Sequence, residues 1–414
     1  MRIGLVSDTY TPQVNGVTTV VRRIVSLLRA QGHEALVVAP RYPATDGPPD
    51  LRVLRIPSLP LPLYPDIRMS LPPFRQVGDF FDAAPPDVVH VHTEGALGLA
   101  GRRYALRRGV PLVTSFHTNF PEYSRHYGVG FLESAVWRWL QWFHRPARVT
   151  FTPGEAIRDD LVRRGLSHAA LWGRGVDPQF FHPGRRDPAW RRWLAGGDDT
   201  LIVLHVGRLA HEKNLGVLIE AWRQTYDALG QRATFVVAGE GPEARRITSR
   251  LPFVRLLGFL PREDLATLYA SADVSVFPSD TETCGLVALE AMASGSAVIA
   301  ADAGGFRESI RPGATGLLVR AHEPRGYRDA IVALANDSAA RFALAAGARK
   351  GLRHVDRATD VDQASDQQQE HDRRERELDH RLPGLAVRAE MNTQVRGARH
   401  PTILPMMGRQ CVRP

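Results

Sequence analysis

Short apolar runs alternate with longer amphipathic stretches over residues 2–319. Residues 2–7 are largely apolar, which is typical of a buried strand. The next stretch has apolar residues at close to i, i+3, i+4 and i+7 spacing, which predicts a helix with one buried face: Val17, Val20, Val21, Ile24, Leu27 and Leu28. The same pattern predicts further strands at 34–39, 51–56, 87–92, 111–116, 149–152, 170–172, 201–206, 233–238, 254–257, 274–277, 297–301 and 315–319, and helices at 154–165, 214–229, 265–271 and 286–293. This alternation predicts an α/β fold with parallel sheets covered by helices on both faces.

Chain length and proline content predict how this α/β chain divides. A chain of 414 residues is long enough for two domains, each with its own core. Prolines and scattered arginines give residues 181–198 a linker-like composition, so we expect an N-terminal domain at 1–180, a linker at 181–198 and a C-terminal domain at 199–352. The proline-rich stretch 57–73 predicts stiff, irregular surface chain.

The net charge of the chain indicates which classes of partner it binds. The chain carries a formal net charge of +9, with 43% hydrophobic and 23% charged residues, which indicates a globular protein with an acidic partner. Phosphate-bearing substrates and anionic lipid heads suit this charge better than nucleic acid, because zinc-ligand sets, RNP-like aromatic motifs and base-reading basic helices are lacking. Two cysteines, no signal-like start and no apolar run of about 18 residues favour a cytoplasmic location.

The most informative stretch is 278–295, which joins a predicted strand to a predicted helix. A strand that ends in a small-residue loop and feeds a helix at Gly285 directs free backbone N–H groups and a helix dipole at one point, which suits a phosphate. Glu282 and Glu290 flank this point. A fully helical 282–290 would separate them by roughly 12 Å along the axis, beyond the about 5–9 Å of a glycosidase carboxylate pair, although a loop at 282 would shorten the gap. Glu282 and Glu290 either bind opposite ends of one long polar ligand, or they have no shared role. In the second case Glu282 lies near the helix dipole and Glu290 is solvated.

Other predicted strand ends carry further candidates. A turn at Gly16-Val17 opens the first helix, but the dinucleotide fingerprint G-x-G-x-x-G is absent, which argues against a nicotinamide dehydrogenase. His117 follows a strand end, where open α/β sheets bind ligands, and it is either a ligand contact or a histidine hydrogen-bonded within the fold. Arg208 and Lys213 lie at a strand end and a helix start, where two cations can neutralise a diphosphate. We expect structural roles for two other histidines, His90 and His92.

The pattern Glu282-x7-Glu290, with Gly-Leu in its middle and Ala-x-Ala-x-Gly after it, resembles the donor-site signature of family-4 retaining glycosyltransferases. The resemblance implies the GT-B fold, in which two Rossmann-like, doubly wound parallel-sheet domains face each other across a cleft. It implies that Glu282 contacts the donor sugar, that Glu290 contacts the ribose hydroxyls, and that the backbone of Cys284, Gly285 and Leu286 meets the diphosphate or sugar. Phe is more usual than Cys at position 284.

The resemblance extends to other motifs. Gly207-Arg208-Leu-x-x-x-Lys213 matches the family's cationic pair, His117 in Phe-His-Thr implies a contact with the transferred sugar, and the Gly16-Val17 backbone is implied to approach the donor diphosphate. Asn15-Gly-Val and the stretch 115–123 are most similar to GDP-mannose-dependent mannosyltransferases that act on glycolipids, with UDP-sugar enzymes as the alternative. These matches imply an N-terminal domain on the acceptor side and a C-terminal domain that binds the donor nucleotide.

The expected reaction is metal-independent transfer of a hexose, with retention, from a nucleotide-diphospho-sugar to a hydroxyl of a lipid or carbohydrate acceptor. No metal is expected, because no Asp-x-Asp-type metal motif appears among these motifs and the resemblance implies a metal-independent mechanism. No cofactor is expected, because the nucleotide sugar is a co-substrate. The rival functions are a sugar-nucleotide epimerase, a phosphorylase and a non-catalytic nucleotide-binding remnant. The aromatic and basic stretch 121–147 either packs internally or lies in a membrane interface, so peripheral binding to the inner face of the cell membrane is a further hypothesis.

The resemblance ends near residue 350. Family members usually finish with a helix that crosses back to the first domain, whereas residues 355–380 are nearly devoid of apolar side chains. Such a segment cannot bury enough surface to offset its ordering entropy. We therefore expect residues 353–414 to form a disordered or non-native tail, and the remnant hypothesis rests on it.

Overall fold

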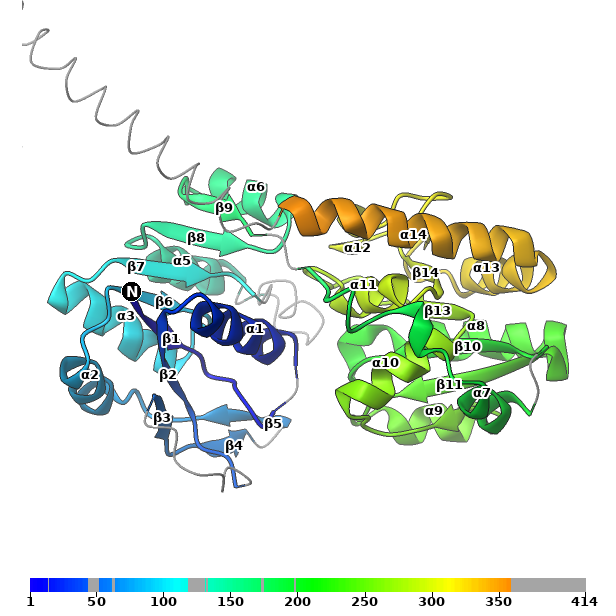
Figure 1. The fold of residues 1–414 in the computed structure, drawn as a ribbon, viewed down its shortest axis with the longest axis horizontal. Coiled ribbons are helices and arrows are strands. Elements are labelled where there is room, and N and C mark those ends of the chain that lie inside the picture. Colours follow the sequence, from blue (N-terminus) through cyan, green and yellow to red (C-terminus); the bar gives the residue numbers. More distant parts are fainter. Residues whose placement is uncertain are drawn as a thin grey trace, which may run out of the picture. The chain divides into compact units, whose positions relative to one another are not determined.

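Two parallel sheets, each covered by helices, form the part of the chain that the structure describes (Figure 1). The structure is a computed structural model that describes residues 1–13, 15–43, 52–61, 64–117, 131, 133–172, 175–196 and 199–358. The sequence prediction of an α/β protein with two Rossmann-like parallel sheets is confirmed.

The first sheet has the strand order β3-β2-β1-β6-β7-β8-β9, and every neighbouring pair is parallel. Its strands are β1 (Arg2–Val6), β2 (Glu34–Pro40), β3 (Val53–Ile56), β6 (Val88–Val91), β7 (Leu112–Ser115), β8 (Val149–Thr152) and β9 (Ala169–Leu171). The helices that alternate with them are α1 (Gly16–Ala30), α2 (Phe74–Ala83), α3 (Ala96–Arg108), α5 (Glu133–His144) and α6 (Glu155–Arg163). Successive side chains of β1 lie on opposite faces of the sheet. Leu5 packs in the cluster with α1, and Val6 packs in the cluster with α2 and α3.

The second sheet has the order β12-β11-β10-β13-β14-β15 and is also fully parallel. Its strands are β10 (Leu201–Val206), β11 (Ala233–Ala238), β12 (Arg255–Leu256), β13 (Val274–Phe277), β14 (Ala297–Ala301) and β15 (Leu317–Val319). The helices around it are α7 (Pro188–Ala195), α8 (Leu215–Leu229), α9 (Ala244–Arg250), α10 (Arg262–Ser271), α11 (Leu286–Ala293), α12 (Phe306–Ser309), α13 (Pro324–Asn336) and α14 (Ser338–Ala358). Short 3-10 turns are η2 (Pro183–Arg185), η3 (His211–Lys213) and η4 (Gly230–Arg232).

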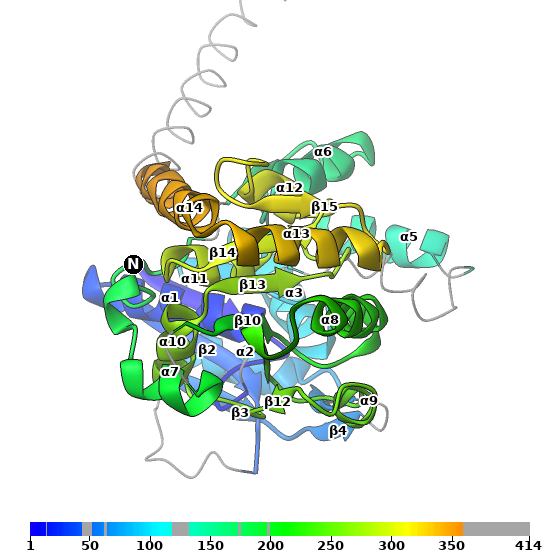
Figure 2. The ribbon, with the colours of Figure 1, turned by 90° about the vertical axis from the view of Figure 1, so that its right-hand side faces the viewer.

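The four inner strands of the second sheet, β10, β11, β13 and β14, are largely buried on both faces, as expected for a parallel sheet. Ile202 and Leu204 pack in one cluster with α10 and α11, whereas Leu201 and Val203 pack in another with α8 and α13. Figure 2 shows the two groups on opposite sides of β10 and β13, with α8 and α13 on one side and α10 and α11 on the other. This packing holds the ends of β10 and β13 in fixed positions.

The proline-rich stretch 57–73 is more regular than its composition indicated. It contains an antiparallel pair of strands, β4 (Leu59–Leu61) and β5 (Tyr64–Met69), in which Leu59 lies opposite Met69. In a two-stranded sheet both strands are edges, and a proline is tolerated there because its missing N–H can face away from the partner strand. The prediction of irregular chain was therefore wrong for these residues.

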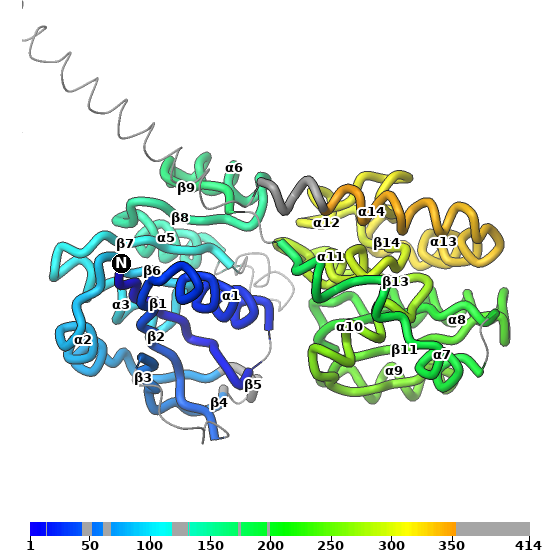
Figure 3. The backbone as a smooth tube through the Cα atoms, in the orientation of Figure 1, coloured from blue at the N-terminus to red at the C-terminus, as the bar shows by residue number. Residues whose placement is uncertain are grey.

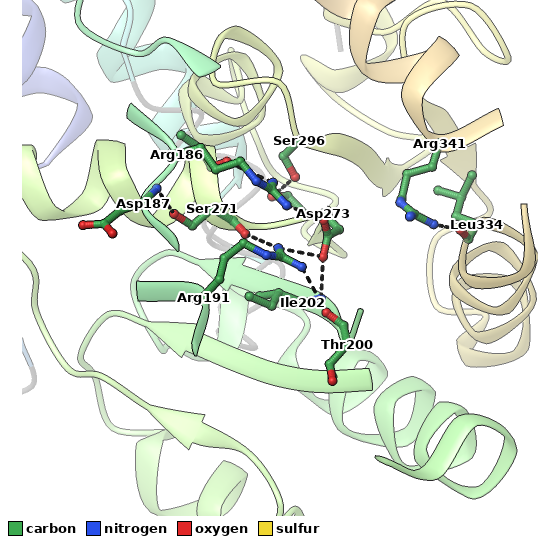
Figure 4. A network of polar contacts seen from close by, with 12 residues as sticks. Arg186, Asp187, Arg191, Thr200, Ile202, Ser271, Asp273, Ser296, Leu334 and Arg341 are labelled. Atoms are coloured by element: carbon green, nitrogen blue, oxygen red, sulfur yellow. Dashed lines mark hydrogen bonds and ion pairs between the residues drawn. The ribbon is translucent and has the colours of Figure 1, made fainter. Parts of the chain in front are cut away.

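The stretch 181–198, which has a linker-like composition, contains α7, and this helix is bound to the second sheet (Figure 4). Buried Arg191 donates from Nη1 to the Ser271 carbonyl at 2.7 Å and to Asp273 Oδ2 at 3.0 Å. The same Asp273 oxygen accepts from the Ile202 backbone N–H at 2.8 Å. Pro188 occupies the first turn of α7, where proline is favoured, and Arg191 is an internal partner, so the linker at 181–198 stays a prediction.

The last described element is α14, which is labelled beside α13 in Figure 3. Its buried residues Ala348 and Leu352 pack in the cluster that includes Ala288 and Met292 of α11. Residues 353–358, the start of the expected tail, continue this helix, and residues 359–414 lie outside the described residues. The disordered or non-native tail therefore stays a prediction. None of the described helices combines the length and apolarity that crossing a bilayer requires.

Candidate functional site

The candidate site lies at the carboxyl ends of β10 and β13, which are neighbours in the second sheet. Ligands of open parallel sheets bind at this edge. β10 continues into Gly207 and Arg208, and β13 continues into the loop that leads to α11. Strand order therefore brings together two motifs that are about 70 residues apart in the sequence.

Lys213 and Glu282 form an ion pair between Nζ and Oε1 that joins the two loops. Both side chains are mostly buried, at 18% and 16% exposed. Lys213 is held at the end of η3, and Asn214 beyond it adopts a left-handed backbone with φ 52°. The Asn214 side chain donates to the Pro278 carbonyl at 3.2 Å, so the loop after β10 is tied to the loop after β13.

Arg208 makes a second ion pair, with the fully buried carboxylate of Glu212. The hydroxyls of Ser279 and Thr281 donate to the Glu212 carbonyl at 3.3 and 3.2 Å. A buried carboxylate beside a guanidinium fixes the position of the cation, since either partner left alone would carry a large desolvation cost. Arg208 is thus a positioned charge at the edge of the sheet.

Glu290 lies within α11 and is partly buried. Burial raises the pKa of its carboxyl to about 7, although the nearby positive charge of Arg262 acts in the opposite direction. Burial also raises the pKa of the Tyr269 phenol well above its usual value, and the negative charges of Glu290 and Glu282 add to that rise. Both carboxylates of the sequence motif therefore act on the same buried tyrosine.

Glycines shape the backbone between the two carboxylates. Gly285 caps α11 with φ +68°, and a Cβ at this position would lie 2.5 Å from the Phe306 ring. Gly305 donates its N–H to the Glu282 carbonyl at 2.7 Å, and a Cβ on Gly304 would lie 2.5 Å from that carbonyl oxygen. The sequence interpretation gave Gly304 and Gly305 no role, although two consecutive glycines just after a strand are a signal for close backbone approach.

The first sheet contributes residues that contact this loop. His117, just beyond β7, is buried, and its carbonyl accepts a hydrogen bond from Thr283 Oγ1 at 3.2 Å. Its ring Nε2 lies 3.0 Å from Nδ1 of buried His92. Gly16 begins α1 after the Asn15 cap, and a Cβ on Gly16 would lie 3.8 Å from Leu286 Cδ1. These contacts lie within one compact unit, Met1–Thr359.

The structure thus brings together several of the residues that the sequence singled out. It pairs Lys213 with Glu282, and it places His117 and Gly16 against the loop of Cys284, Gly285 and Leu286. Val17 follows Gly16 in the first turn of α1, and Gly207 precedes Arg208 at the end of β10. Within the described residues, no group of three or more His, Cys, Asp or Glu side chains is arranged to hold a metal ion.

His205 is a polar residue of the site that the sequence interpretation missed. Its Nδ1 donates to the Val276 carbonyl at 2.8 Å, and burial lowers its pKa to about 4, so the ring is neutral. Its buried Nε2 has no hydrogen-bond partner in the described part of the chain and lies 3.7 Å from the position of a Cβ on Gly207. The available signal was a single histidine in the otherwise apolar strand β10.

Two family models match the chain. Residues 14–180 match Glycosyltransferase Family 4, and residues 200–337 match Glycosyl transferases group 1. A GDP-mannose-dependent alpha-mannosyltransferase of Mycobacterium tuberculosis is 37% identical over 355 residues, which cover 84% of this chain and 91% of that protein. An alpha-monoglucosyldiacylglycerol synthase of Streptococcus pneumoniae is 28% identical over 317 residues, which cover 72% of this chain and 71% of that protein.

Among solved structures, Anabaena Alr3699/HepE in complex with UDP-glucose superposes with a TM-score of 0.72 at 21% identity. The match covers 89% of this chain and 100% of that chain. This likeness supports the fold, and the predicted GT-B architecture is confirmed. Together with the identity to the mycobacterial enzyme over most of both chains, it supports a single assignment. The chain belongs to glycosyltransferase family 4.

Proposed function

We propose that this protein is a retaining mannosyltransferase that moves mannose from GDP-mannose to a hydroxyl of a glycolipid or sugar acceptor. The observation that carries the proposal is the Lys213–Glu282 pair at the edge of the second sheet, beside the start of α11. In this proposal the lysine of the pair serves the diphosphate and the adjacent carboxylate serves the sugar hydroxyls. The choice of GDP-mannose is supported by the name of the mycobacterial relative, with a UDP-sugar donor as the alternative.

In this proposal, Arg208 and Lys213 neutralise the diphosphate as its bond to the sugar breaks. Charge that develops on a leaving group is best stabilised by cations and N–H groups that are already in place. The backbone around Cys284, Gly285 and Leu286, where the first turn of α11 begins, adds N–H groups that can donate to the diphosphate. Glu282 is a partner of Lys213, and bound diphosphate would share that cation.

The remaining candidates are assigned to the rest of the donor. We propose that Glu282 and His117 contact the mannose, that Glu290 accepts from the ribose hydroxyls, and that the backbone at Gly16 and Val17 approaches the diphosphate. The contact of Thr283 with the His117 carbonyl supports this grouping, because it places the first-domain histidine beside the Glu282 loop.

The test is transfer by the purified full-length chain with GDP-mannose or UDP-glucose, with and without an alkyl mannoside or diacylglycerol acceptor. We expect acceptor-dependent transfer from GDP-mannose, with an α-configured product in the NMR spectrum. Donor epimerised without acceptor would favour an epimerase, and a requirement for inorganic phosphate would favour a phosphorylase. Binding of GDP without any turnover would favour the non-catalytic remnant.

A lipid acceptor at a membrane surface is supported by the surface of α5. Trp137 and Phe143 of this helix are buried, whereas Trp139 and Trp142 are 40% and 47% exposed. The guanidinium of Arg102 lies 3.9 Å from the centroid of the Trp142 ring. Exposed tryptophans beside arginines are typical of helices that bind anionic membrane interfaces. The helix therefore packs internally on one side, and we propose that its other side binds the membrane.

Co-sedimentation with vesicles tests this surface. We expect binding to vesicles that contain anionic lipid, and at least fivefold weaker binding after Trp139→Ser with Trp142→Ser. A matched control is Trp193→Ser, because Trp193 is also exposed, at 56%, but lies on α7. Equal binding of all three proteins would contradict the membrane proposal and leave the donor proposal unaffected.

A further inference from the structure

Three buried imidazoles lie in a row behind the candidate site. His90 belongs to β6, His92 follows that strand, and His117 follows β7, its neighbour in the sheet. The ring centroids of His90 and His92 are 4.0 Å apart, and those of His92 and His117 are 5.3 Å apart with nearly parallel planes. The three side chains are 8%, 0% and 5% exposed. Their row leads from the interior of the first sheet to the residue that contacts the Glu282 loop.

The link between His92 and His117 joins two ring nitrogens. His92 Nδ1 and His117 Nε2 are 3.0 Å apart, so one of them carries the hydrogen and the other accepts it. A doubly protonated ring has N–H groups at both nitrogens, so this link requires that at least one of the two rings is neutral. Because Nε2 of His117 is engaged here, a hydrogen bond from this ring to a ligand would use Nδ1.

The rest of the row fixes the His92 ring. His90 stacks close to it, and His90 Nε2 is hydrogen-bonded to Ser115 Oγ at 2.7 Å. Burial lowers the pKa of His90 to about 3, so this neighbour is neutral and brings no charge next to His92. A ring packed in this way has little freedom to turn, which is what a residue that orients another residue requires.

We infer that His92 is a positioning residue, whose hydrogen bond sets the ring orientation and the tautomer of His117. The hydrogen bond at one imidazole nitrogen decides which form the other nitrogen presents. This inference deepens the proposed function and rests on it, because it gives the ring of His117 a defined Nδ1 for the transferred sugar. His92 itself acts through His117 and does not touch the donor.

Substitutions at position 92 can separate this role from simple packing. Asparagine places an amide atom where Nδ1 of histidine lies, glutamine places its amide farther out, and phenylalanine fills the ring space without a hydrogen bond. Loss of one hydrogen bond corresponds to about a tenfold effect. We expect His92→Phe to lower kcat about tenfold with the KM for GDP-mannose changed less than about threefold, His92→Asn to recover most of kcat, and His92→Gln to recover little.

A double-mutant cycle tests whether His92 acts through His117. In a His117→Ala background, His92→Phe should change kcat by less than about twofold, because the residue to be oriented is gone. An equal loss in both backgrounds would overturn the inference, as would equal activity of His92→Asn and His92→Phe. If His92→Phe does not fold, as judged by circular dichroism, the comparison of His92→Asn with His92→Gln decides the same question.

A measurement without turnover keeps this inference separate from the proposed function. Nitrogen-15 NMR of histidine-labelled protein reports the tautomer of each ring. We expect one tautomer for His117 in the parent chain and a mixture in His92→Phe, whether or not mannose is transferred. An unchanged His117 tautomer in His92→Phe would overturn the inference. Absence of transfer with a changed tautomer would instead count against the proposed function alone.

Discussion

The two domains contribute chemically different halves of the candidate site. The first domain supplies a buried row of imidazoles that ends at His117, together with the turn at Gly16. The second supplies ion pairs, Lys213 with Glu282 and Arg208 with Glu212, and the partly buried Glu290. Hydrogen-bonding groups suit a sugar, whereas positioned cations suit a diphosphate that gains charge as it leaves. Under the proposed function, charge stabilisation therefore falls to the cations of the second domain, whereas the sugar is contacted from both domains, by His117 and Glu282.

The strongest test of this division is Lys213→Ala. Loss of one positioned charge-stabilising donor typically costs about 100-fold or more in kcat. We expect at least that loss in mannosyl transfer, measured at saturating GDP-mannose. A change in KM alone would place Lys213 in ground-state binding and would break the assignment of charge stabilisation to the second domain.

The chain offers a matched control, since Lys350 on α14 is the only other lysine in the sequence. Lys350→Ala should transfer mannose at the parent rate. Reductive methylation with carbon-13 would label these two side chains and the amino terminus, so that each gives a resolvable NMR signal. Addition of GDP should shift the Lys213 signal and leave the Lys350 signal in place.

Gly285→Ala tests the backbone conformation at the start of α11, on which the second domain's part of the site depends. Both Gly285 and Gly313 adopt left-handed backbones, with φ +68° and +73°, but only at Gly285 would a Cβ meet the Phe306 ring. A left-handed alanine costs about 1–2 kcal/mol, and forcing atoms into a packed core costs about 1–3 kcal/mol more. We expect Gly285→Ala to lower the free energy of unfolding by about 3 kcal/mol and Gly313→Ala by about 1, measured by urea denaturation.

Equal destabilisation by the two alanines would mean that the Phe306 ring moves aside at little cost. The close approach of Gly285 would then not define the start of α11. In that case GDP binding should also survive Gly285→Ala, which isothermal titration would show.

Glu282→Gln tests whether Glu282, in the second domain's part of the site, acts on the sugar or on the diphosphate. The amide keeps the shape of the side chain but leaves Lys213 without the charge of this partner. We expect GDP to bind within about threefold of its parent affinity, and kcat to fall about tenfold, the worth of one charge-assisted hydrogen bond. The control is Glu263→Gln, at an exposed carboxylate in the first turn of α10. Parallel losses of GDP binding and transfer would assign Glu282 to the nucleotide.

The sequence predicted the elements of this site better than their contacts. Alternating apolar runs were sufficient for the parallel sheets, because strands buried on both faces leave a strong signal. The pairing of Lys213 with Glu282 depends on the adjacency of β10 and β13, and periodicity carries no information on strand order. Each of the two residues was singled out by its place between a strand and a helix and by the resemblance of its motif, but neither signal paired them.

Residues that act through others were the least predictable. His92 was expected to be structural, since a histidine in an apolar strand gives no sign of the ring it contacts. His205 left the same weak signal in β10. The composition of the arginine-rich, proline-containing stretch around Arg191 also gave no sign that its guanidinium is buried against Asp273. In each case the missing information was a partner distant in the sequence.

The smallest effect we predict is the pH-dependent stability of Glu290→Gln. Burial raises the folded-state pKa of this carboxyl from an ordinary value of 4.5 to about 7, so the folded protein holds its proton more tightly than the unfolded chain. The resulting stabilisation is fully present below about pH 4.5 and is lost as the pH rises through about 7. The full shift corresponds to about 3 kcal/mol, and solvent access to the partly buried group reduces this to about 1 kcal/mol.

Glutamine cannot ionise, so Glu290→Gln should be more stable than the parent protein at pH 8 by about 1 kcal/mol, and no more stable at pH 4.5. Thermal unfolding at the two pH values measures this difference, with Glu263→Gln as the exposed control that should show no such gain. The parent should also bind GDP more tightly at pH 8 than at pH 6, because only the carboxylate form accepts two hydrogen bonds from the ribose. A gain in stability without any pH dependence of GDP binding would mean that Glu290 is a strained buried carboxyl away from the ribose, and the charged half of the site would then end at Glu282.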